Sequence, residues 1–327
     1  MKPVIAVIGG FLGGGKTSLI LAAAGVLERK GLHVAVVLND QGDDLVDTHL
    51  VQSRGVAADQ VSGGCFCCRF PDLMDALDRV SVRAPEVIFA EAVGSCTDIV
   101  ATTLRPLLRD YPARFRVAPL TVVLHPGAPF ADADLQFLNA NQQAEADVLV
   151  ARTCGVHGAA RLVDSATGEG VREWLEEILA GTNPVGVRAL TLDYARYAAA
   201  EASLGWLNAR VTARAAPAIS PAMLVGPLLD RLSAAVPNIV HLKLLVQCES
   251  GYLKAALIAS HADPVVEGTL DASPSRDHEI LLNVRALAGP VELQSIIERE
   301  FGHLPARLTW QSVQSFRPSA PVPYHKP

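Results

Sequence analysis

The first 180 residues alternate short, wholly apolar runs with stretches whose apolar positions recur every three or four residues. The former pattern is typical of parallel strands covered on both faces, and the latter of helices. The predicted strands are Val4–Ile8, Val34–Leu38, Val87–Ala90, Leu120–Leu124 and Val148–Ala151. The predicted helices are Thr17–Arg29, Pro71–Val80, Ile99–Arg109, Asp132–Glu145 and Gly170–Leu179. This order predicts an α/β fold, with helices on both sides of a mostly parallel sheet in three layers.

The pattern changes after residue 182. Period-two alternation and strand-like runs now surround two helical stretches, which predicts a smaller α+β domain with helices on one side of an antiparallel sheet. The predicted elements are Leu204–Arg214, Pro221–Ala235, Ile239–Gln247, Tyr252–Ala259, Glu279–Leu287 and Pro290–Phe301. From His303 onward, five prolines and no clear period predict an extended tail. The expected organisation is therefore a first domain over 1–182, a second over 200–303 and a Pro-rich tail over 304–327.

A phosphate-binding motif lies between the first predicted strand and the first predicted helix. Residues 10–17 read GFLGGGKT, a complete GxxxxGK[ST] loop. The glycines let successive backbone N–H groups turn toward one anion, and the following helix N-terminus adds partial positive charge. Lys16 is expected to reach the β- and γ-phosphates, and the Thr17 hydroxyl to ligate Mg²⁺. The predicted nucleotide-binding residues of this P-loop NTPase motif are Gly10, Gly13, Gly14, Gly15, Lys16, Thr17 and Ser18.

Net charge and hydropathy argue against several classes of protein. The formal net charge is −6, without the basic excess that nucleic-acid binding usually requires. The N-terminal apolar stretch is about five residues long before glycines and Lys16 follow, too short for a signal-peptide core or a membrane span. We therefore expect a cytoplasmic protein with neither nucleic acid nor membrane as partner.

Three of the six cysteines crowd into four positions, Cys65, Cys67 and Cys68. Such spacing lets several thiolates face one ion, for which tetrahedral Zn²⁺ is the default, and three ligands leave a fourth position open. The alternative is that small apolar cysteines fill a turn. Cys96 either joins this site or packs in the core, a choice the sequence leaves open.

With these two motifs, the chain resembles the CobW family of P-loop GTPases, in which a GCxCC motif couples metal to GTP turnover. The likeness lies in residues 10–17 and in Gly64–Cys68. It extends to Asn39–Gly42, similar to the family's first switch segment, and to Glu91–Gly94, similar to its second. Ser165 and Ala166 resemble the family's SA loop near the base. The resemblance implies a metal-handling GTPase that uses Mg²⁺ and a Zn-like ion.

The switch-like residues also make chemical sense by themselves. Glu91 ends an apolar strand beside the phosphate loop, where a carboxylate can hold Mg²⁺ or its water. Gly94 would let a backbone N–H approach the γ-phosphate. Asp40 is a second candidate for Mg²⁺ or for the attacking water, although a carboxylate at a strand end is often only a helix cap. The candidate catalytic residues are Lys16, Glu91 and Asp40.

One departure from the family concerns the base. An NKxD segment is expected after Val148–Ala151, yet the chain has Arg152, Thr153, Cys154 and Gly155. The aspartate that accepts two hydrogen bonds from guanine is absent, which leaves GTP or ATP open as the substrate.

Three functions fit these observations. The first is a nucleoside triphosphate hydrolase acting as a metallochaperone for a client metalloprotein. The second is a nucleotide-binding regulatory protein with degenerate base specificity, and the third is a small-molecule phosphotransferase. Turnover without an added acceptor separates the first from the other two. Homo-oligomerisation is compatible with all three.

Overall fold

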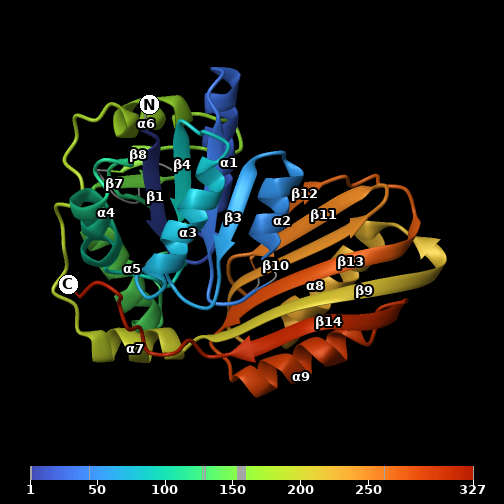
Figure 1. The fold of residues 1–327 in the computed structure, drawn as a ribbon. Helices are drawn as coiled ribbons and strands as arrows, with labels where there is room; N and C mark the ends of the chain where they lie inside the picture. Colours follow the sequence, from blue (N-terminus) through green and yellow to red (C-terminus); the bar gives the residue numbers. More distant parts are fainter. Residues whose placement is uncertain are drawn as a thin grey trace. The chain divides into compact units, whose positions relative to one another are not determined.

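The computed structural model describes residues 2–43, 45–126, 128, 130–152, 160–260 and 262–326. The chain divides into two compact units (Figure 1). Unit 1 comprises Met1–Gln41, Asp47–Glu201 and Ala320–Pro327, and unit 2 comprises Gly42–Val46 and Ala202–Ser319.

Unit 1 is built around a parallel sheet with strand order β3-β2-β4-β1-β6-β7-β8, to which β5 adds beside β1. Its strands are β1 (Val4–Gly10), β2 (Val34–Asn39), β3 (Ala57–Val61), β4 (Val87–Glu91), β5 (Arg116–Val117), β6 (Thr121–Val123), β7 (Val148–Ala151) and β8 (Arg161–Leu162). In β1, β2 and β4 every residue is buried, which explains the continuous apolar runs. The carboxyl ends of these central strands therefore meet at one edge of the sheet.

Helices cover both faces of this sheet (Figure 1). Those that begin before residue 202 are α1 (Lys16–Arg29), α2 (Val46–Ser53), α3 (Phe70–Ser81), a π-helical turn (Val100–Leu104), α4 (Arg105–Asp110), α5 (Ala133–Glu145), α6 (Val171–Leu179) and α7 (Tyr194–Ala202). One core lies between the sheet, α1 and α6, and includes Ile8, Phe89 and Trp174. Because a parallel sheet binds ligands at the carboxyl ends of its strands, the site is expected there.

Unit 2 contains an antiparallel sheet with strand order β12-β11-β10-β13-β9-β14. The elements are β9 (Gly205–Ile219), α8 (Pro221–Ala235), β10 (Ile239–Cys248), β11 (Gly251–Leu257), β12 (Val265–Gly268), β13 (Ser275–Ala286), α9 (Pro290–Phe301) and β14 (Arg307–Phe316). Leu228 of α8 and Ile297 of α9 both pack into one core with sheet residues such as Leu244. Both helices thus lie on the same face.

The predicted fold class is confirmed by this parallel sheet and by the separate antiparallel one. The tail predicted over 304–327 is wrong in part, because β14 pairs with β9. A bulge between Trp310 and Ser312 shifts the register of β14. It breaks the alternation of apolar residues and hides the strand from a period-two search.

Helix α7 also lies outside the predicted elements and beyond the predicted boundary at 182. The sequence nevertheless contains the features that favour a helix here. The Asp193 carboxylate accepts hydrogen bonds from the N–H groups of Ala195 and Arg196, at 2.9 and 3.1 Å, and an alanine-rich stretch follows. This is an ordinary N-cap before residues of high helix propensity.

Candidate functional site

The phosphate loop joins β1 to α1 at the carboxyl edge of the parallel sheet. Lys16 is buried, and its Nζ donates to the carbonyl oxygens of Gly10 and Phe11 at 2.9 and 3.2 Å. The ammonium group is thus held over its own loop, the position from which it can turn to a phosphate. Burial and the charge of Lys16 lower the pKa of nearby His125 to about 4, so this imidazole adds no second cation. Ser18 is exposed in the first turn of α1.

Thr17 and Glu91 meet beside the loop although 74 positions separate them. Both are buried, and the Thr17 hydroxyl donates to Glu91 Oε2 at 2.8 Å. Two oxygens on one octahedral Mg²⁺, each 2.0–2.1 Å from the ion, would lie about 2.9 Å apart. The hydroxyl and the carboxylate therefore have the spacing and the hard oxygen donors that Mg²⁺ requires.

Gly94 packs directly on the phosphate loop. A Cβ at this position would lie 2.7 Å from Leu12 Cδ2 and 2.9 Å from the backbone nitrogen of Leu12. Only glycine fits without a shift of one of the two segments. The strand end that carries Glu91 is thus in close contact with the loop at a second point.

The other predicted nucleotide residues are placed as follows. Asp40 follows β2, which neighbours β4, and its N–H donates to the carbonyl oxygen of Val61 at 3.1 Å. Ser165 and Ala166 follow β8 in a turn, where the Asp164 carboxylate accepts the Ala166 N–H at 2.8 Å. Arg152 is described, whereas Thr153, Cys154 and Gly155 lie outside the described residues.

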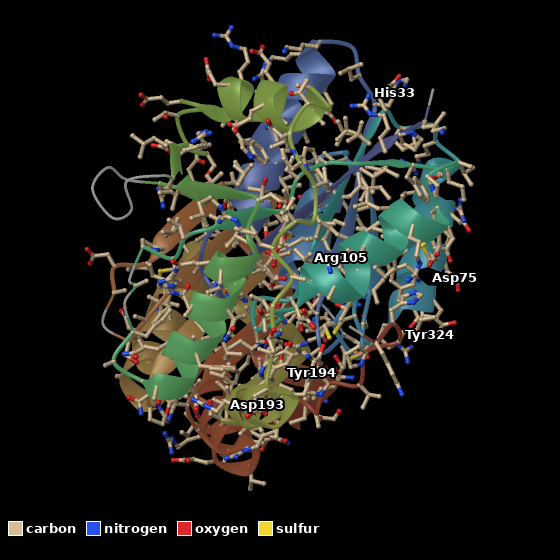
Figure 2. The ribbon with its side chains drawn as sticks, turned by 90° about the vertical axis from the view of Figure 1, so that its left-hand side faces the viewer. His33, Asp75, Arg105, Asp193, Tyr194 and Tyr324 are labelled. Carbon is tan, nitrogen blue, oxygen red and sulfur yellow. The ribbon has the colours of Figure 1, made fainter. Side chains whose placement is uncertain are left out.

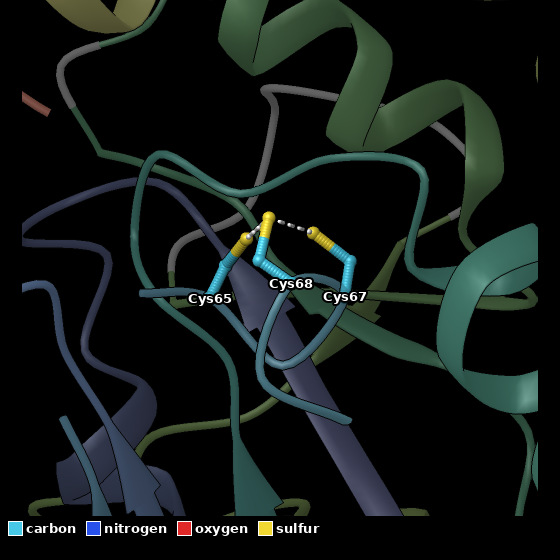
Figure 3. A group of neighbouring side chains, drawn as sticks. All are labelled: Cys65, Cys67 and Cys68. Atoms are coloured by element: carbon cyan, nitrogen blue, oxygen red, sulfur yellow. Dashed lines mark hydrogen bonds between the residues drawn. The ribbon is translucent and has the colours of Figure 1, made fainter. Parts of the chain in front are cut away.

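Cys65, Cys67 and Cys68 lie between β3 and α3, and their sulfur atoms are all within 4.8 Å of one another. Figure 3 shows the three thiols turned toward one another. The Sγ–Sγ distances are 3.5 Å for Cys65–Cys68 and 3.6 Å for Cys67–Cys68. Cys65 and Cys67 are 1% exposed and Cys68 is half-buried. The arrangement offers three soft ligands to one thiophilic ion.

The Asn39 side chain holds the cysteine loop to the end of β2. Its amide group donates to the carbonyl oxygens of Val61 and Gly64, at 3.0 and 2.7 Å, and its carbonyl oxygen accepts the Phe66 N–H at 2.8 Å. These bonds fix the backbone on both sides of Cys65. The sequence placed Asn39 in a switch-like segment, but it gave no signal of this clamp, which spans 22 to 27 positions.

The segment after Glu91 is held by side chains from two helices. Gln142 of α5 donates to the carbonyl oxygens of Gly94 and Cys96, both at 2.9 Å. Glu201 of α7 accepts the Ser95 hydroxyl at 2.5 Å, and the Tyr197 hydroxyl accepts the Thr97 N–H at 3.3 Å. No local sequence pattern connects these positions, so sequence reasoning missed them.

The segment 320–326 also packs on the cysteine loop. The Tyr324 N–H donates to the carbonyl oxygen of Cys67 at 2.8 Å, and the Val322 amide donates to the Cys68 sulfur. The Tyr324 ring stacks on Phe70, the first residue of α3, with centroids 6.3 Å apart. In Figure 2, Tyr324 lies beside the helix that carries Asp75. This segment covers part of the half-buried Cys68.

The thiols differ in acidity. The hydrogen bond with Cys65, together with burial, raises the pKa of Cys68 to about 11. Hydrogen bonds from Cys65 and Cys67 lower the pKa of Cys96 to about 7, against the effect of its burial. A bound cation would favour the thiolate form throughout the cluster.

The N-terminal part of the chain is similar to a known protein family. Residues 4–151 match the family model "CobW/HypB/UreG, nucleotide-binding domain". Over this stretch the chain is similar to CobW/HypB/UreG nucleotide-binding domains. The resemblance drawn from the GxxxxGKT and GCxCC motifs is thereby confirmed, and the matched CobW/HypB/UreG segment contains both motifs and both switch-like stretches.

A curated relative is the zinc chaperone YjiA of Escherichia coli strain K12, which is 30% identical over 97 residues. The aligned stretch covers 27% of this chain and 30% of YjiA, so less than a third of the relative's length is spanned.

Two of the solved structures to which the chain is similar are those of Zn(II)-bound YjiA GTPase from E. coli and of HypB from Helicobacter pylori in complex with nickel. The YjiA structure has a TM-score of 0.35 and 12% identity, over 91% of this chain and 99% of that one. The HypB structure has a TM-score of 0.38 and 16% identity, over 58% of this chain and 90% of that one. Within the described part of the chain, no helix combines the length and apolar character needed to cross a membrane.

Proposed function

We propose that the chain binds a Mg²⁺–nucleoside triphosphate at the phosphate loop, hydrolyses it, and couples this cycle to the binding and release of a Zn-like ion at Cys65, Cys67 and Cys68. The ion is cargo for a client metalloprotein rather than a resident cofactor. The match to the CobW/HypB/UreG model and the relative named a zinc chaperone support this class of activity.

The nucleotide half of the proposal rests on three groups. Lys16 is the proposed contact for the phosphates, and the oxygens of Thr17 and Glu91, 2.8 Å apart, are the proposed pair for Mg²⁺. Mg²⁺ keeps several waters and binds phosphate oxygens as well, so two protein oxygens are a sufficient set. Asp40 stands at the same sheet edge and is the proposed partner for the attacking water.

The coupling rests on one observation, the Asn39 clamp. Asn39 ends β2 immediately before Asp40, and its side chain holds the backbone of Gly64 and Phe66. When a γ-phosphate draws in the segment that contains Asp40, these bonds carry the displacement to Cys65. A shift of a few tenths of an ångström in one ligand changes metal affinity, because thiolate geometry is part of the site.

Anaerobic metal titration tests the proposal. Zn²⁺ is titrated against a chromophoric chelator, with and without a non-hydrolysable triphosphate, for the wild type and for the Cys65→Ser, Cys67→Ser, Cys68→Ser triple variant. We expect the triple variant to lose the site. Nucleotide should change the Zn²⁺ affinity of the wild type by about 5- to 150-fold, and Zn²⁺ must change nucleotide affinity by the same factor. Equal Zn²⁺ affinity in both proteins would remove the site from the proposal.

The Asn39→Ala variant tests the route of coupling. It should retain metal and nucleotide binding but bring the coupling factor close to one. Asn141→Ala is the matched control, because its side chain donates to Phe137 within α5 and should leave coupling intact. Turnover assayed without an added acceptor then distinguishes a hydrolase from a phosphotransferase or a regulatory protein.

A further inference from the structure

The short segment Gly42–Val46 belongs to unit 2, although the chain before it, up to Gln41, and after it, from Asp47, belongs to unit 1. It begins at the last residue of the switch-like stretch Asn39–Gly42. We propose that unit 2 senses the nucleotide state through this segment, which we call the strap. The inference gives unit 2 a role that the proposed function does not, and it rests on the nucleotide binding of that function.

Two side chains of the antiparallel sheet hold Asp43 of the strap. The Asp43 N–H donates to Gln314 Oε1 at 3.0 Å, and the Asp43 carboxylate accepts a hydrogen bond from Gln314 Nε2 at 2.9 Å. The carbonyl oxygen of Asp43 accepts a hydrogen bond from Asn208 Nδ2 at 2.8 Å. Gln314 thus binds both the backbone and the side chain of one residue, which fixes the orientation of the strap as well as its position.

The other end of the strap is held by the same sheet. Val46 is the first residue of α2, so its N–H is one of those that the helix itself leaves without a partner. Asn283 Oδ1 accepts this N–H at 3.0 Å. The Val46 side chain is fully buried and packs in a small cluster with Leu245 and Leu281. The strap is therefore bound to the sheet by polar and apolar contacts together.

A buried polar network supports the side chains that hold the strap. Asn208 Oδ1 accepts hydrogen bonds from Asn283 Nδ2 at 3.1 Å and from Arg285 Nη1 at 2.8 Å. The Arg285 guanidinium lies over the Trp206 ring, 4.0 Å from its centroid. A Cβ at Gly42 would overlap the Asn208 amide, which these bonds keep in place. Because unpaired buried amides are costly, a movement of the strap must displace the strands that carry this network, β9 and β13.

The strap and the proposed catalytic group share one stretch of chain. Asp40, the proposed partner for the attacking water, precedes Gly42 by two residues. Two residues span at most about 7 Å, so the chain has little slack between these positions. A triphosphate that draws in Asp40 therefore pulls on the strap. By linkage, a strap whose seating depends on nucleotide must in turn alter nucleotide affinity by the same factor.

Hydrogen exchange of the full chain, followed by mass spectrometry with and without a Mg²⁺-bound, non-hydrolysable triphosphate, tests the inference. We expect exchange in peptides from β9 and β13 to change by about fivefold or more on binding, the lower end of ordinary coupling between sites. Peptides from β12, at the opposite edge of the sheet from β14, are the internal control. Calorimetry on the same preparation establishes whether the triphosphate binds.

The two possible failures are distinguishable. Binding of the triphosphate with unchanged exchange in β9 and β13 would overturn this inference and leave the proposed function in place. Absence of triphosphate binding in the wild type would overturn the nucleotide half of the proposed function, and this inference with it. Neither outcome depends on the folding of a variant.

Gln314→Ala then tests whether the strap is the route. Gln314 is half-buried, and its replacement removes two hydrogen bonds to Asp43. The response of β9 and β13 to the triphosphate should be lost, and triphosphate affinity should shift by about fivefold or more. Gln311→Ala is the matched control on the same strand, because Gln311 donates to Thr212 at 3.3 Å, and it should respond like the wild type. A full response in Gln314→Ala would overturn the strap as the connection.

Discussion

The phosphate loop (residues 10–17) and the cysteine loop (residues 62–69) occupy equivalent places in unit 1. Each follows a parallel strand, contains consecutive glycines and leads into a helix, α1 or α3. They differ in what fixes their functional groups. The phosphate loop presents its own backbone N–H groups and the adjacent Lys16 and Thr17. The cysteine loop depends on groups from distant segments, among them the Asn39 side chain and the Tyr324 backbone N–H.

This difference separates a self-contained site from an assembled one. A loop whose ligands are its own backbone groups keeps its chemistry wherever a strand and helix support it. A thiol cluster clamped by Asn39, and flanked by a segment that Gln142 and Glu201 hold, changes when any of those segments moves. The phosphate loop is therefore suited to binding the same substrate in every state of the protein. The cysteine loop is suited to responding to movements of the segments that hold it.

The largest expected effect comes from removing the positive charge of Lys16 in the phosphate loop, the self-contained site. Lys16→Ala should lower triphosphate turnover by about 100-fold or more, because Lys16 is the cation expected to contact the β- and γ-phosphates. The cysteine loop should be unaffected in the absence of nucleotide. Turnover assays test the first expectation, and zinc titration of the same preparation tests whether the cysteine loop is unaffected. Near-normal turnover in a folded Lys16→Ala protein would contradict the assigned role of the phosphate loop.

A smaller effect is expected where the second switch-like segment contacts the phosphate loop. In Gly94→Ala the added Cβ would meet both the side chain and the backbone nitrogen of Leu12, at 2.7 and 2.9 Å. The backbone contact cannot be relieved by a rotamer change, so we expect unfolding free energy to fall by about 1–3 kcal/mol. Triphosphate affinity should fall about tenfold as the loop is displaced. Urea unfolding and calorimetry measure the two quantities.

Gly226→Ala is the control for this substitution. Gly226 lies in α8 of unit 2, and a Cβ there meets nothing within 4 Å. Replacing an exposed helical glycine by alanine should stabilise by about 0.5–1 kcal/mol and leave nucleotide affinity unchanged. If Gly94→Ala behaved like Gly226→Ala, the segment after Glu91 would be mechanically independent of the phosphate loop.

Sequence reasoning recovered the elements that local pattern specifies. The apolar runs became β1, β2, β4, β6 and β7, because strands buried on both faces leave a continuous signature. It failed where the signal is short or interrupted. The two-residue strands β5 and β8 have no period to detect, and the bulge at Gln311 divides β14.

The same distinction applies to the candidate site. The GxxxxGKT and GCxCC motifs are contiguous, so their residues could be named from the sequence. The Asn39 clamp, the Gln142 bridge and the contact of Tyr324 with Cys67 join positions far apart in the chain. A single sequence contains no pattern that links residues so far apart.

The buried carboxylates near the assembled site predict a pH effect. Burial raises the pKa of Glu145 to about 8, although the Val100 N–H donates to it at 3.0 Å. The native state therefore keeps a proton that the unfolded chain releases near pH 4.5. The stability that the protonated Glu145 contributes is fully present below pH 4.5 and is lost as the pH rises toward 8. Relative to Glu145→Gln, wild-type unfolding free energy should fall by about 1.4 kcal/mol per pH unit in that window.

Urea unfolding of both proteins between pH 5 and 8 measures the difference. Glutamine can still accept the Val100 N–H and donate to the Thr97 hydroxyl, so the variant retains the hydrogen bonds. Glu201, whose pKa burial raises to about 7, contributes with the same sign in both proteins and cancels. The exposed Glu292→Gln change in α9 is the control and should follow the wild type. A constant difference between wild type and Glu145→Gln across the window would show that Glu145 is ionised in the folded protein.

The smallest expected effect concerns the base, the one part of the nucleotide site that the phosphate loop does not define. Arg152, Thr153, Cys154 and Gly155 stand where the resemblance implies NKxD, so these four positions offer no aspartate to guanine. We expect GTP to be preferred over ATP by less than tenfold, which corresponds to about 1.4 kcal/mol, less than a paired hydrogen bond to a charged group supplies. Competition binding of the two triphosphates decides it. A GTP preference above a hundredfold would require another guanine reader, for which the turn of Ser165 and Ala166, held by Asp164, would be the first segment to mutate. The base would then be recognised by an assembled site like that of the cysteines.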